Sequence, residues 1–306
     1  MGRSPVININ DQARFFVVSL AMGSRPGPPA DVAQLLRAEA RFGCCRCGHP
    51  FYQYHHIVPW EQDQHFRPED MMVLCPNCHD MTRGGLSVEE QRKFKSRPHN
   101  MRKGYAAGII SVPSNVPVLS LGGTLFVNDG TMLAFKGEPV LSASLNEVGG
   151  LELSLNLEDR EGRPIAMVER NEWVSGDTSV WDLECGYRWL KIRARKRQVL
   201  LEVDAKTFPI RVRANLWRAG KQIFVGPNGL AFGGQQKSVQ WFNMTFAAMY
   251  FSFDEFTEVN SGGQTIKLNY APDPRYGSGK LFAGTDPDVL RQAVDHLVTV
   301  RAASDR

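Results

Sequence analysis

Apolar residues recur at helical spacing in two early segments of the chain. These are "NDQARFFVVSLAMG" (residues 10–23) and "PPADVAQLLRAEARFG" (residues 28–43), which the breaker "GSRPGPP" separates and Gly43 closes. A third helix is expected over residues 87–96, because Ser87 and Glu90 have the spacing of a capping box and Pro98 follows as a stop.

The pattern changes near Tyr105 to short β-branched and aromatic runs separated by glycine-containing turns. In "TLFVNDGTMLAF" (residues 124–135) Asn-Asp-Gly joins two apolar runs, which predicts a β-hairpin. In "LELSLNLEDREGRPIAMVE" (residues 151–169) alternating residues flank a charged turn. Strands therefore dominate this part, as a β-sandwich, a rolled sheet or a solenoid.

The last segment predicts a closing helix. Asp286 is a cap and Pro287 takes the first helical position. An apolar stripe follows at Val289, Leu290, Val294, Leu297 and Val298. The expected fold class is α+β, with an N-terminal unit over residues 1–104, a β-rich unit over 105–265 and a tail with this helix over 266–306.

Composition and charge narrow the class of protein. The 306 residues are 42% apolar and 22% charged, as in an ordinary globular protein. Since no apolar run reaches about 18 residues, we expect a cytoplasmic protein without a membrane span. The net charge of +4 permits a polyanionic partner without requiring one.

Four of the six cysteines form two Cys-x-x-Cys pairs, Cys44 with Cys47 and Cys75 with Cys78. Two such pairs surround one Zn²⁺ ion tetrahedrally and leave no open position, which predicts a structural zinc site. Cys45 and Cys185 stand outside this pattern and are expected to be ordinary buried thiols.

Between and after the cysteine pairs lie "YHHIVPW" (residues 54–60), "MMVLC" (71–75) and "CHDMTRGG" (78–85), which suggest a strand, a loop, a second strand and a short helix. This arrangement resembles the HNH endonuclease family and its zinc-stabilised ββα-metal fold, over about residues 41–104. The resemblance implies that His56 is the general base, which activates water for attack on a phosphodiester. It also implies that His55 and His79 hold a catalytic Mg²⁺ or Mn²⁺ ion.

Two features qualify this site. Adjacent strand residues point to opposite faces, so His55 and His56 serve one site only if the strand bends or ends there. Asp70 stands where the family has an asparagine. It is a candidate catalytic residue that could raise the basicity of His56 or join the metal shell, or it could mark a degenerate nuclease. His49 and His65 are expected to be surface loop residues.

Basic residues near this motif are candidates for contact with DNA. They are Arg92, Lys93, Lys95, Arg102 and Lys103 in "RKFKSRPHNMRKG", together with Arg83 on the short helix. A second cluster, "RWLKIRARKRQ" (residues 188–198), alternates as a half-buried strand does, and its outer face either touches DNA or protects a sheet edge. The aromatic segment from Trp241 fits a core strand better than a base-stacking surface.

The leading hypothesis is a metal-dependent HNH endonuclease that hydrolyses DNA, of restriction or phage-defence type by analogy alone. One alternative is a catalytically degenerate zinc-ribbon protein that binds nucleic acid. Another is a nuclease released by a regulatory ligand of the β-rich unit, which could also form a homo-oligomer.

Overall fold

The computed structural model describes residues 26–176, 180–227, 229–232, 243–252 and 269–304. The helix expected over residues 10–23 lies outside them. The N-terminal elements are α1 (Ala30–Glu39), β1 (Gln53–His56), the 3₁₀ turn η2 (Pro68–Asp70), β2 (Met71–Leu74), α2 (Pro76–Asp80), the 3₁₀ turn η3 (Met81–Arg83), α3 (Val88–Ser96) and α4 (His99–Lys103).

Helix α1 confirms the second predicted helix, although it ends at Glu39, before Gly43. Arg41 and Phe42 adopt positive φ angles of 52° and 61°, which no helix can continue. Gly43 serves another purpose. A Cβ atom there would lie 2.6 Å from the Gly48 carbonyl oxygen, so the glycine permits a tight turn.

Helix α3 confirms the capping box. The Ser87 hydroxyl accepts a hydrogen bond from the Glu90 amide (3.3 Å), and the Glu90 carboxylate accepts one from the Ser87 amide (2.8 Å). Each side chain thereby satisfies a backbone donor that the helix itself cannot pair.

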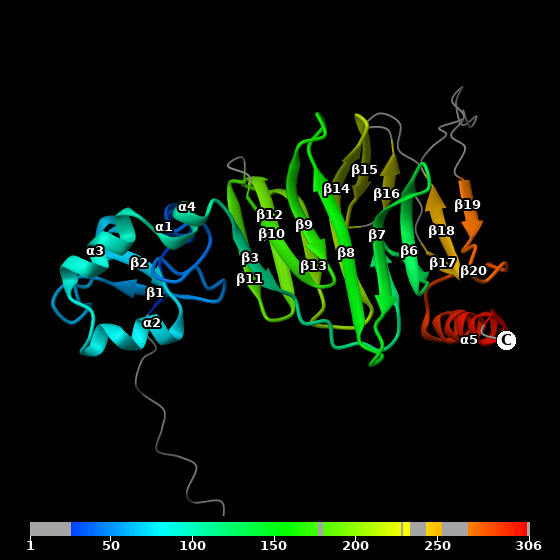
Figure 1. Ribbon diagram of the computed structural model, residues 1–306, viewed down its shortest axis with the longest axis horizontal. Helices are drawn as coiled ribbons and strands as arrows, with labels where there is room; N and C mark the ends of the chain where they lie inside the picture. The colour runs from blue at the N-terminus through cyan, green and yellow to red at the C-terminus, as the bar shows by residue number, and fades with distance from the viewer. Residues whose placement is uncertain (1–25, 177–179, 228, 233–242, 253–268, 305–306) are drawn as a thin grey trace, which may run out of the picture.

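Two large sheets follow the N-terminal elements (Figure 1). Among the described residues, the first has the order β19-β18-β6-β7-β8-β9-β10-β3, and the second the order β11-β12-β13-β14-β4-β5-β17-β20, with β15 and β16 added beside β14. Strands of the first sheet are β3 (Ala106–Ile109), β6 (Gly130–Phe135), β7 (Glu138–Leu145), β8 (Leu151–Glu158), β9 (Pro164–Glu169), β10 (Glu172–Ser175), β18 (Met249–Ser252) and β19 (Asn269–Pro272). Strands of the second are β4 (Val118–Leu121), β5 (Thr124–Val127), β11 (Asp182–Gly186), β12 (Trp189–Arg195), β13 (Gln198–Asp204), β14 (Ile210–Arg218), β15 (Lys221–Val225), β16 (Leu230–Phe232), β17 (Met244–Ala247) and β20 (Lys280–Ala283).

The buried side chains of the two sheets form one hydrophobic cluster, in which Phe126 and Trp173 are among the largest members. Strand β8 illustrates the origin of this core, because its leucines are buried while the intervening residues are not. Its antiparallel pairing with β9 confirms the strands expected over residues 151–169. The α+β fold class is confirmed, and the β-rich part is a sandwich.

The hairpin expected at Asn128-Asp129-Gly130 is absent. Strand β5 pairs with β4 and β17 in one sheet, whereas β6 pairs with β7 and β18 in the other. The Asn128 amide donates to the Thr131 carbonyl (2.6 Å) and to Asp273 (2.9 Å), while the Asp129 carboxylate accepts from the Leu145 amide (2.8 Å). These buried polar side chains hold a crossing between sheets, which local sequence cannot distinguish from a turn.

The aromatic segment after Trp241 makes a second crossing. Strands β17 and β18 belong to different sheets and are joined through Ala248, whose φ is 53°. Phe246 and Phe251 are buried against Phe126, with ring centroids 5.3 and 5.4 Å away. The assignment of this segment to the core is confirmed for the described residues, as two strands instead of one.

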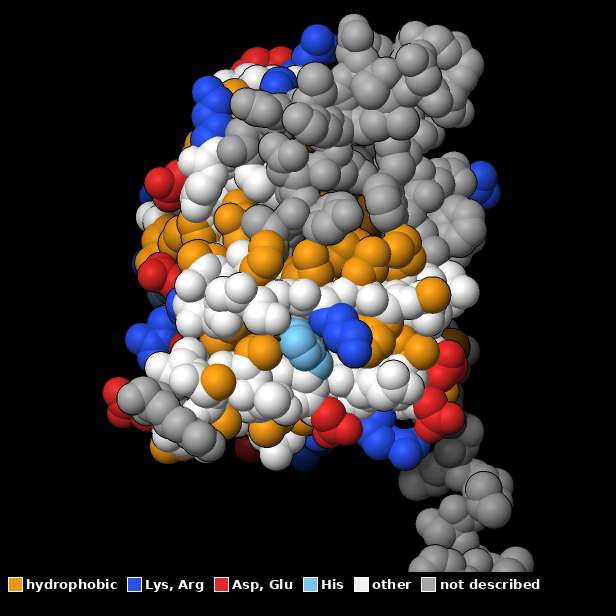
Figure 2. Space-filling view, turned by 90° about the vertical axis from the view of Figure 1, so that its right-hand side faces the viewer, with side chains coloured by type: hydrophobic (Ala, Val, Ile, Leu, Met, Phe, Trp, Pro, Cys, Tyr) orange, Lys and Arg blue, Asp and Glu red, His pale blue; other side chains and the backbone are white. Residues whose placement is uncertain are grey.

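Helix α5 (Pro287–Ser304) confirms the closing helix, and Asp286 accepts from the Val289 amide (3.1 Å) as its cap. Ala293 and Leu297 are buried, but Val298 is 59% exposed and does not belong to the packed stripe. Figure 2 faces this end of the molecule, where hydrophobic side chains form a band between scattered charged ones. No helix in the described residues is long and apolar enough to cross a membrane.

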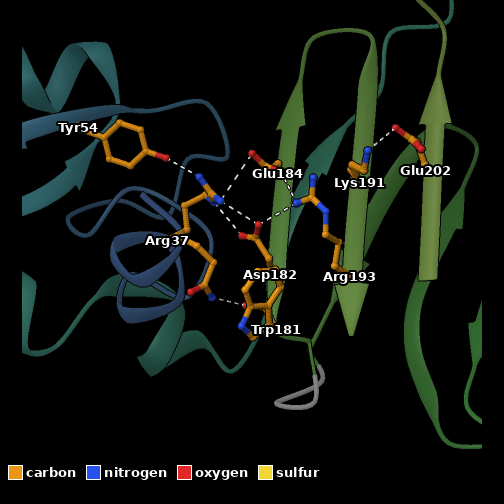
Figure 3. Close-up of polar contacts among 9 residues, drawn as sticks. Arg37, Tyr54, Trp181, Asp182, Glu184, Lys191, Arg193 and Glu202 are labelled. Carbon is orange, nitrogen blue, oxygen red and sulfur yellow. Dashed lines mark hydrogen bonds and ion pairs between the residues drawn. The ribbon is translucent and has the colours of Figure 1, made fainter. Parts of the chain in front are cut away.

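A buried ion pair joins the N-terminal elements to the second sheet (Figure 3). The Arg37 guanidinium of α1 donates two hydrogen bonds of 2.8 Å to the carboxylate of Asp182 on β11. Arg193 of β12 donates to the same carboxylate (2.8 Å) and also contacts Glu184. The side chains of Arg37 and Asp182 are only 8% and 2% exposed, so both charges depend on this network for compensation.

The same guanidinium reaches toward β1. Arg37 donates to the Tyr54 hydroxyl (2.6 Å), one residue before His55. Burial by itself would lower the pKa of Arg37, but its hydrogen bond with Asp182 raises the pKa above the ordinary value. One side chain therefore ties β1 to β11.

Strand β12 lies between β11 and β13, so its basic residues do not protect a sheet edge. Arg193 is paired as described, and Lys191 donates to Glu202 of β13 (2.7 Å). Lys191 and Arg193 are therefore paired across the sheet with carboxylates, whereas Arg195 at the end of the strand bonds Gln198. The central position of β12 corrects the edge interpretation.

Replacing Arg37 with Met should lower the free energy of unfolding by about 3–5 kcal/mol, because Asp182 would stay buried with part of its compensation lost. Urea unfolding measures the change. Arg291→Met is the control, since its ion pair with Asp288 is 71% and 78% exposed and should contribute less than about 1 kcal/mol. Equal effects of the two substitutions would contradict a structural role for the buried pair.

Candidate metal centre and histidine site

The sulfur atoms of Cys44, Cys47, Cys75 and Cys78 all lie within 4.8 Å of one another. The Cys47 sulfur is 3.6 Å from that of Cys75 and 3.7 Å from that of Cys78. Four thiolates bound tetrahedrally at a Zn–S distance of about 2.3 Å would have sulfur atoms about 3.8 Å apart. The observed spacing therefore fits a zinc ion.

Two turns present these sulfurs. In the first, the Gly48 amide donates to the Cys44 carbonyl (2.7 Å) and the Cys44 amide donates to the His49 carbonyl (2.9 Å). In the second, Cys75 is the N-cap of α2 and its sulfur accepts from the Cys78 amide (3.5 Å). Each pair is thus held by backbone geometry.

The electrostatics of the cluster favour a cation. Burial, and then the nearby Cys44 thiol, raise the pKa of the Cys47 thiol well above its usual range. A bound Zn²⁺ would supply the positive charge that lets all four thiols ionise. Arg46 brings a positive charge to the cluster, and its guanidinium donates to the Cys78 sulfur at 3.7 Å. The sequence pattern did not single out this residue.

The other two cysteines lie apart from the cluster's ligand set. Cys45 is 2% exposed in the small N-terminal core, and burial raises its pKa to about 11. Cys185 donates to the Pro50 carbonyl (3.3 Å), and burial raises its pKa to about 12. Both thiols are therefore protonated at neutral pH.

The structure brings His55 and His79 together. Their ring centroids are 4.9 Å apart, with His55 on β1 and His79 on α2, immediately after Cys78 of the cysteine cluster. The cysteine cluster thereby fixes the start of the helix that carries one of the two imidazoles. Two converging imidazoles are suitable ligands for a divalent ion such as Mn²⁺ or Zn²⁺.

Gln91 orients His55. Its amide nitrogen donates to the Leu86 carbonyl (3.1 Å), so its amide oxygen faces the His55 Nε2 atom at 2.9 Å. His55 must then carry its proton on Nε2, which gives Nδ1 the lone pair in the neutral ring. Sequence reasoning missed Gln91, because a glutamine among the charged residues of α3 carries no signal of burial.

His56 is the last residue of β1. Its ring packs against those of Trp60, His65 and Phe66, with centroids 5.2, 5.2 and 6.0 Å away, and the residue is 7% exposed. The His56 Nε2 atom lies 2.9 Å from the His65 carbonyl oxygen and donates to it.

His65 is not the surface loop residue expected from the sequence. It is 6% exposed, its Nδ1 accepts from the Arg67 amide (3.2 Å) and its Nε2 lies 3.3 Å from the Val58 carbonyl. These bonds fix the loop whose carbonyl group holds His56. His65 becomes buried only when this loop folds, so the sequence carried no sign of its burial. His49, by contrast, is exposed.

Asp70 lies at the end of η2 and forms ion pairs with Arg67 (3.0 Å) and Arg92 (2.8 Å). The hydrogen bond from Arg92, followed by that from Arg67, lowers the pKa of this carboxyl group. Its backbone carbonyl accepts from the Ile57 amide (2.8 Å), directly after the two histidines. The contacts of Asp70 therefore connect β1, η2 and α3.

The basic residues expected at DNA differ in their surroundings. Arg92 is engaged by Asp70, and Lys95 forms an ion pair with Glu39 at 2.5 Å. Lys103 lies 4.0 Å from the centre of the Tyr105 ring. Exposed side chains are found at Arg83, Lys93 and Arg102.

Comparison with known proteins agrees with this geometry. Residues 44–83 match the family model described as HNH endonuclease, which confirms the resemblance for this segment. No curated protein and no solved structure matches the chain. The segment contains the cysteine cluster and the candidate site histidines His55, His56 and His79, and it indicates a nuclease-type function with a nucleic-acid substrate.

Replacing Cys75 with Ser should abolish stoichiometric zinc binding, because a serine hydroxyl does not ionise to replace the thiolate. Zinc per chain is measured by atomic emission after dialysis. Cys185→Ser is the matched control, since it removes a thiol outside the cluster and should retain the metal. Equal zinc content in both variants would contradict the four-cysteine site.

Proposed function

We propose that the protein is a metal-dependent endonuclease that hydrolyses phosphodiester bonds of DNA. The observation that carries the proposal is the convergence of His55 and His79 beside a four-cysteine cluster, in a segment that matches the HNH endonuclease model. In this proposal residues 1–104 form the nuclease unit, residues 105–265 a β-rich recognition or regulatory unit, and residues 266–306 its closing tail.

His55, through Nδ1, and His79 would hold a divalent ion, Mg²⁺ or Mn²⁺. When bound, the ion supplies Lewis-acid stabilisation of the charge that develops on the phosphate and the leaving oxygen. The chain's own part is to orient the ligands. Gln91 fixes the tautomer of His55, and the turn at Cys75 and Cys78 fixes the helix that carries His79.

His56 would be the general base. Because its Nε2 donates to the His65 carbonyl, the lone pair of the neutral ring belongs to Nδ1, which would accept the proton of water. The same carbonyl would stabilise the imidazolium that forms. Asp70 would act at a distance from the chemistry, by bracing Arg67 and Arg92 beside β1.

A second candidate function is a zinc protein that binds nucleic acid without hydrolysing it. The burial of His56 beneath Trp60 and Phe66 favours it, since a base must meet water. The exposed cations Lys93 and Arg102 would serve either function, because phosphate contacts position nucleic acid irrespective of sequence.

Plasmid cleavage with added Mg²⁺ or Mn²⁺ separates the two functions. His56→Ala should reduce the cleavage rate by at least about a hundredfold, the usual contribution of a general base. His79→Ala should also reduce the rate strongly, because it removes a ligand of the proposed catalytic ion. The control is His49→Ala, which removes an exposed histidine near the zinc turn and should cut normally. If wild type cuts and His56→Ala cuts equally well, His56 is not the base. No cleavage by wild type under any metal would favour the binding function.

Substitutions of Gln91 test the orienting hydrogen bond. Gln91→Met removes the acceptor at similar size and should weaken the affinity for the catalytic ion about 10–100-fold. Gln91→Glu keeps an acceptor for His55 and should retain most of that affinity. The measurement is the Mn²⁺ concentration that gives half-maximal cleavage. The same value for Met and wild type would exclude a positioning role.

A further inference from the structure

A separate cavity of about 660 Å³ opens on the second sheet. The β12–β13 turn forms one wall, and the strands β14 and β15 supply the floor. Its size is in the range of small-molecule and cofactor sites. No residue of the histidine site or of the cysteine cluster lines it.

The turn contributes three consecutive cations, Arg195, Lys196 and Arg197, all exposed. Arg213 adds a fourth from β14 and is anchored by Glu202 at 2.9 Å, the carboxylate that also accepts from Lys191 in Figure 3. The described residues that line the cavity include no aspartate or glutamate. Such a wall suits a phosphate group.

The floor is aromatic and amide-rich. Trp217 and Phe224 line the cavity, and Phe224 is 42% exposed although it lies on a strand. Between them the Gln222 amide donates to the Asn215 amide oxygen at 2.6 Å. Because this bond uses the Asn215 oxygen and one Gln222 N–H, the amide nitrogen of Asn215 and the amide oxygen of Gln222 remain as a donor and an acceptor for a ligand. Aromatic faces stack on bases, and paired amides match base edges.

We propose that this cavity binds a nucleotide unit, with the phosphate at the Arg195–Arg197 turn and the base against Trp217 and Phe224. Two other classes of ligand fit the cavity less well. An acidic peptide would use its cations but leave the aromatic floor without a partner, and an apolar ligand would use the floor but leave the cations without one. The nucleotide can be free or part of a DNA strand, since both present the same groups. The inference stands independently of hydrolysis at the histidines.

The test uses the full-length, zinc-loaded protein in buffer without added Mg²⁺ or Mn²⁺. Calorimetry with the deoxynucleoside 5′-monophosphates, and fluorescence anisotropy with a short single-stranded oligodeoxynucleotide, measure binding. Lys196→Ala combined with Arg197→Ala should raise the Kd at least about tenfold, and Trp217→Ala about tenfold, whereas Trp217→Phe should retain most of the affinity. Phe224→Ala, at an exposed side chain, provides a second test of stacking should Trp217→Ala fail to fold.

The charge-matched control is Lys136→Ala combined with Arg160→Ala, two exposed cations in turns of the other sheet, and it should leave the Kd unchanged. Binding of monophosphates identifies a free nucleotide as a sufficient ligand, and binding of the oligonucleotide alone identifies a nucleotide within a strand. Either result supports the proposal if the cavity variants abolish it. Binding unaffected by those variants, no binding of either probe, or inorganic phosphate binding as tightly as nucleotides would overturn it.

Discussion

The convergence of four cysteine sulfurs on one point is the constraint on which the N-terminal part of the structure depends. Its hydrophobic core is small, and three of the four cysteines, Cys44, Cys75 and Cys78, are among its members. A core of this size stabilises a fold weakly unless a metal or a disulfide assists it. The cluster joins the turn after α1 to the start of α2, and between these lie the paired strands β1 and β2. The position of His79 relative to His55 follows from that closure.

The second determinant is electrostatic. Arg37 is a residue of the N-terminal elements, yet its charge is compensated by Asp182 of the sandwich. Burying both groups is favourable only while their hydrogen bonds are complete, so the pair specifies how α1 lies on β11. Since Arg37 also holds the Tyr54 hydroxyl, the strand that carries His55 and His56 is connected to the sheet through one side chain.

Several parts of the fold were predictable because their causes are local. The capping box at Ser87, the cap at Asp286 and the alternation of β8 each depend on residues a few positions apart. The cysteine spacing was equally informative, because few other arrangements explain two Cys-x-x-Cys pairs. The crossing at Asn128 was misread as a hairpin, since its buried partner Asp273 lies far away in sequence.

The sequence by itself determined the helical or strand character of most described segments, and it singled out the four cysteines and the histidines that could meet a metal. The tertiary structure decided which histidines converge, how Gln91 sets the tautomer of one of them, and where basic and aromatic side chains of β12 to β15 form a cavity. The physical reason is the range of the interactions. Caps, turns and strand alternation act within a few residues, whereas burial, ion pairing and cavity shape join residues that only folding brings together.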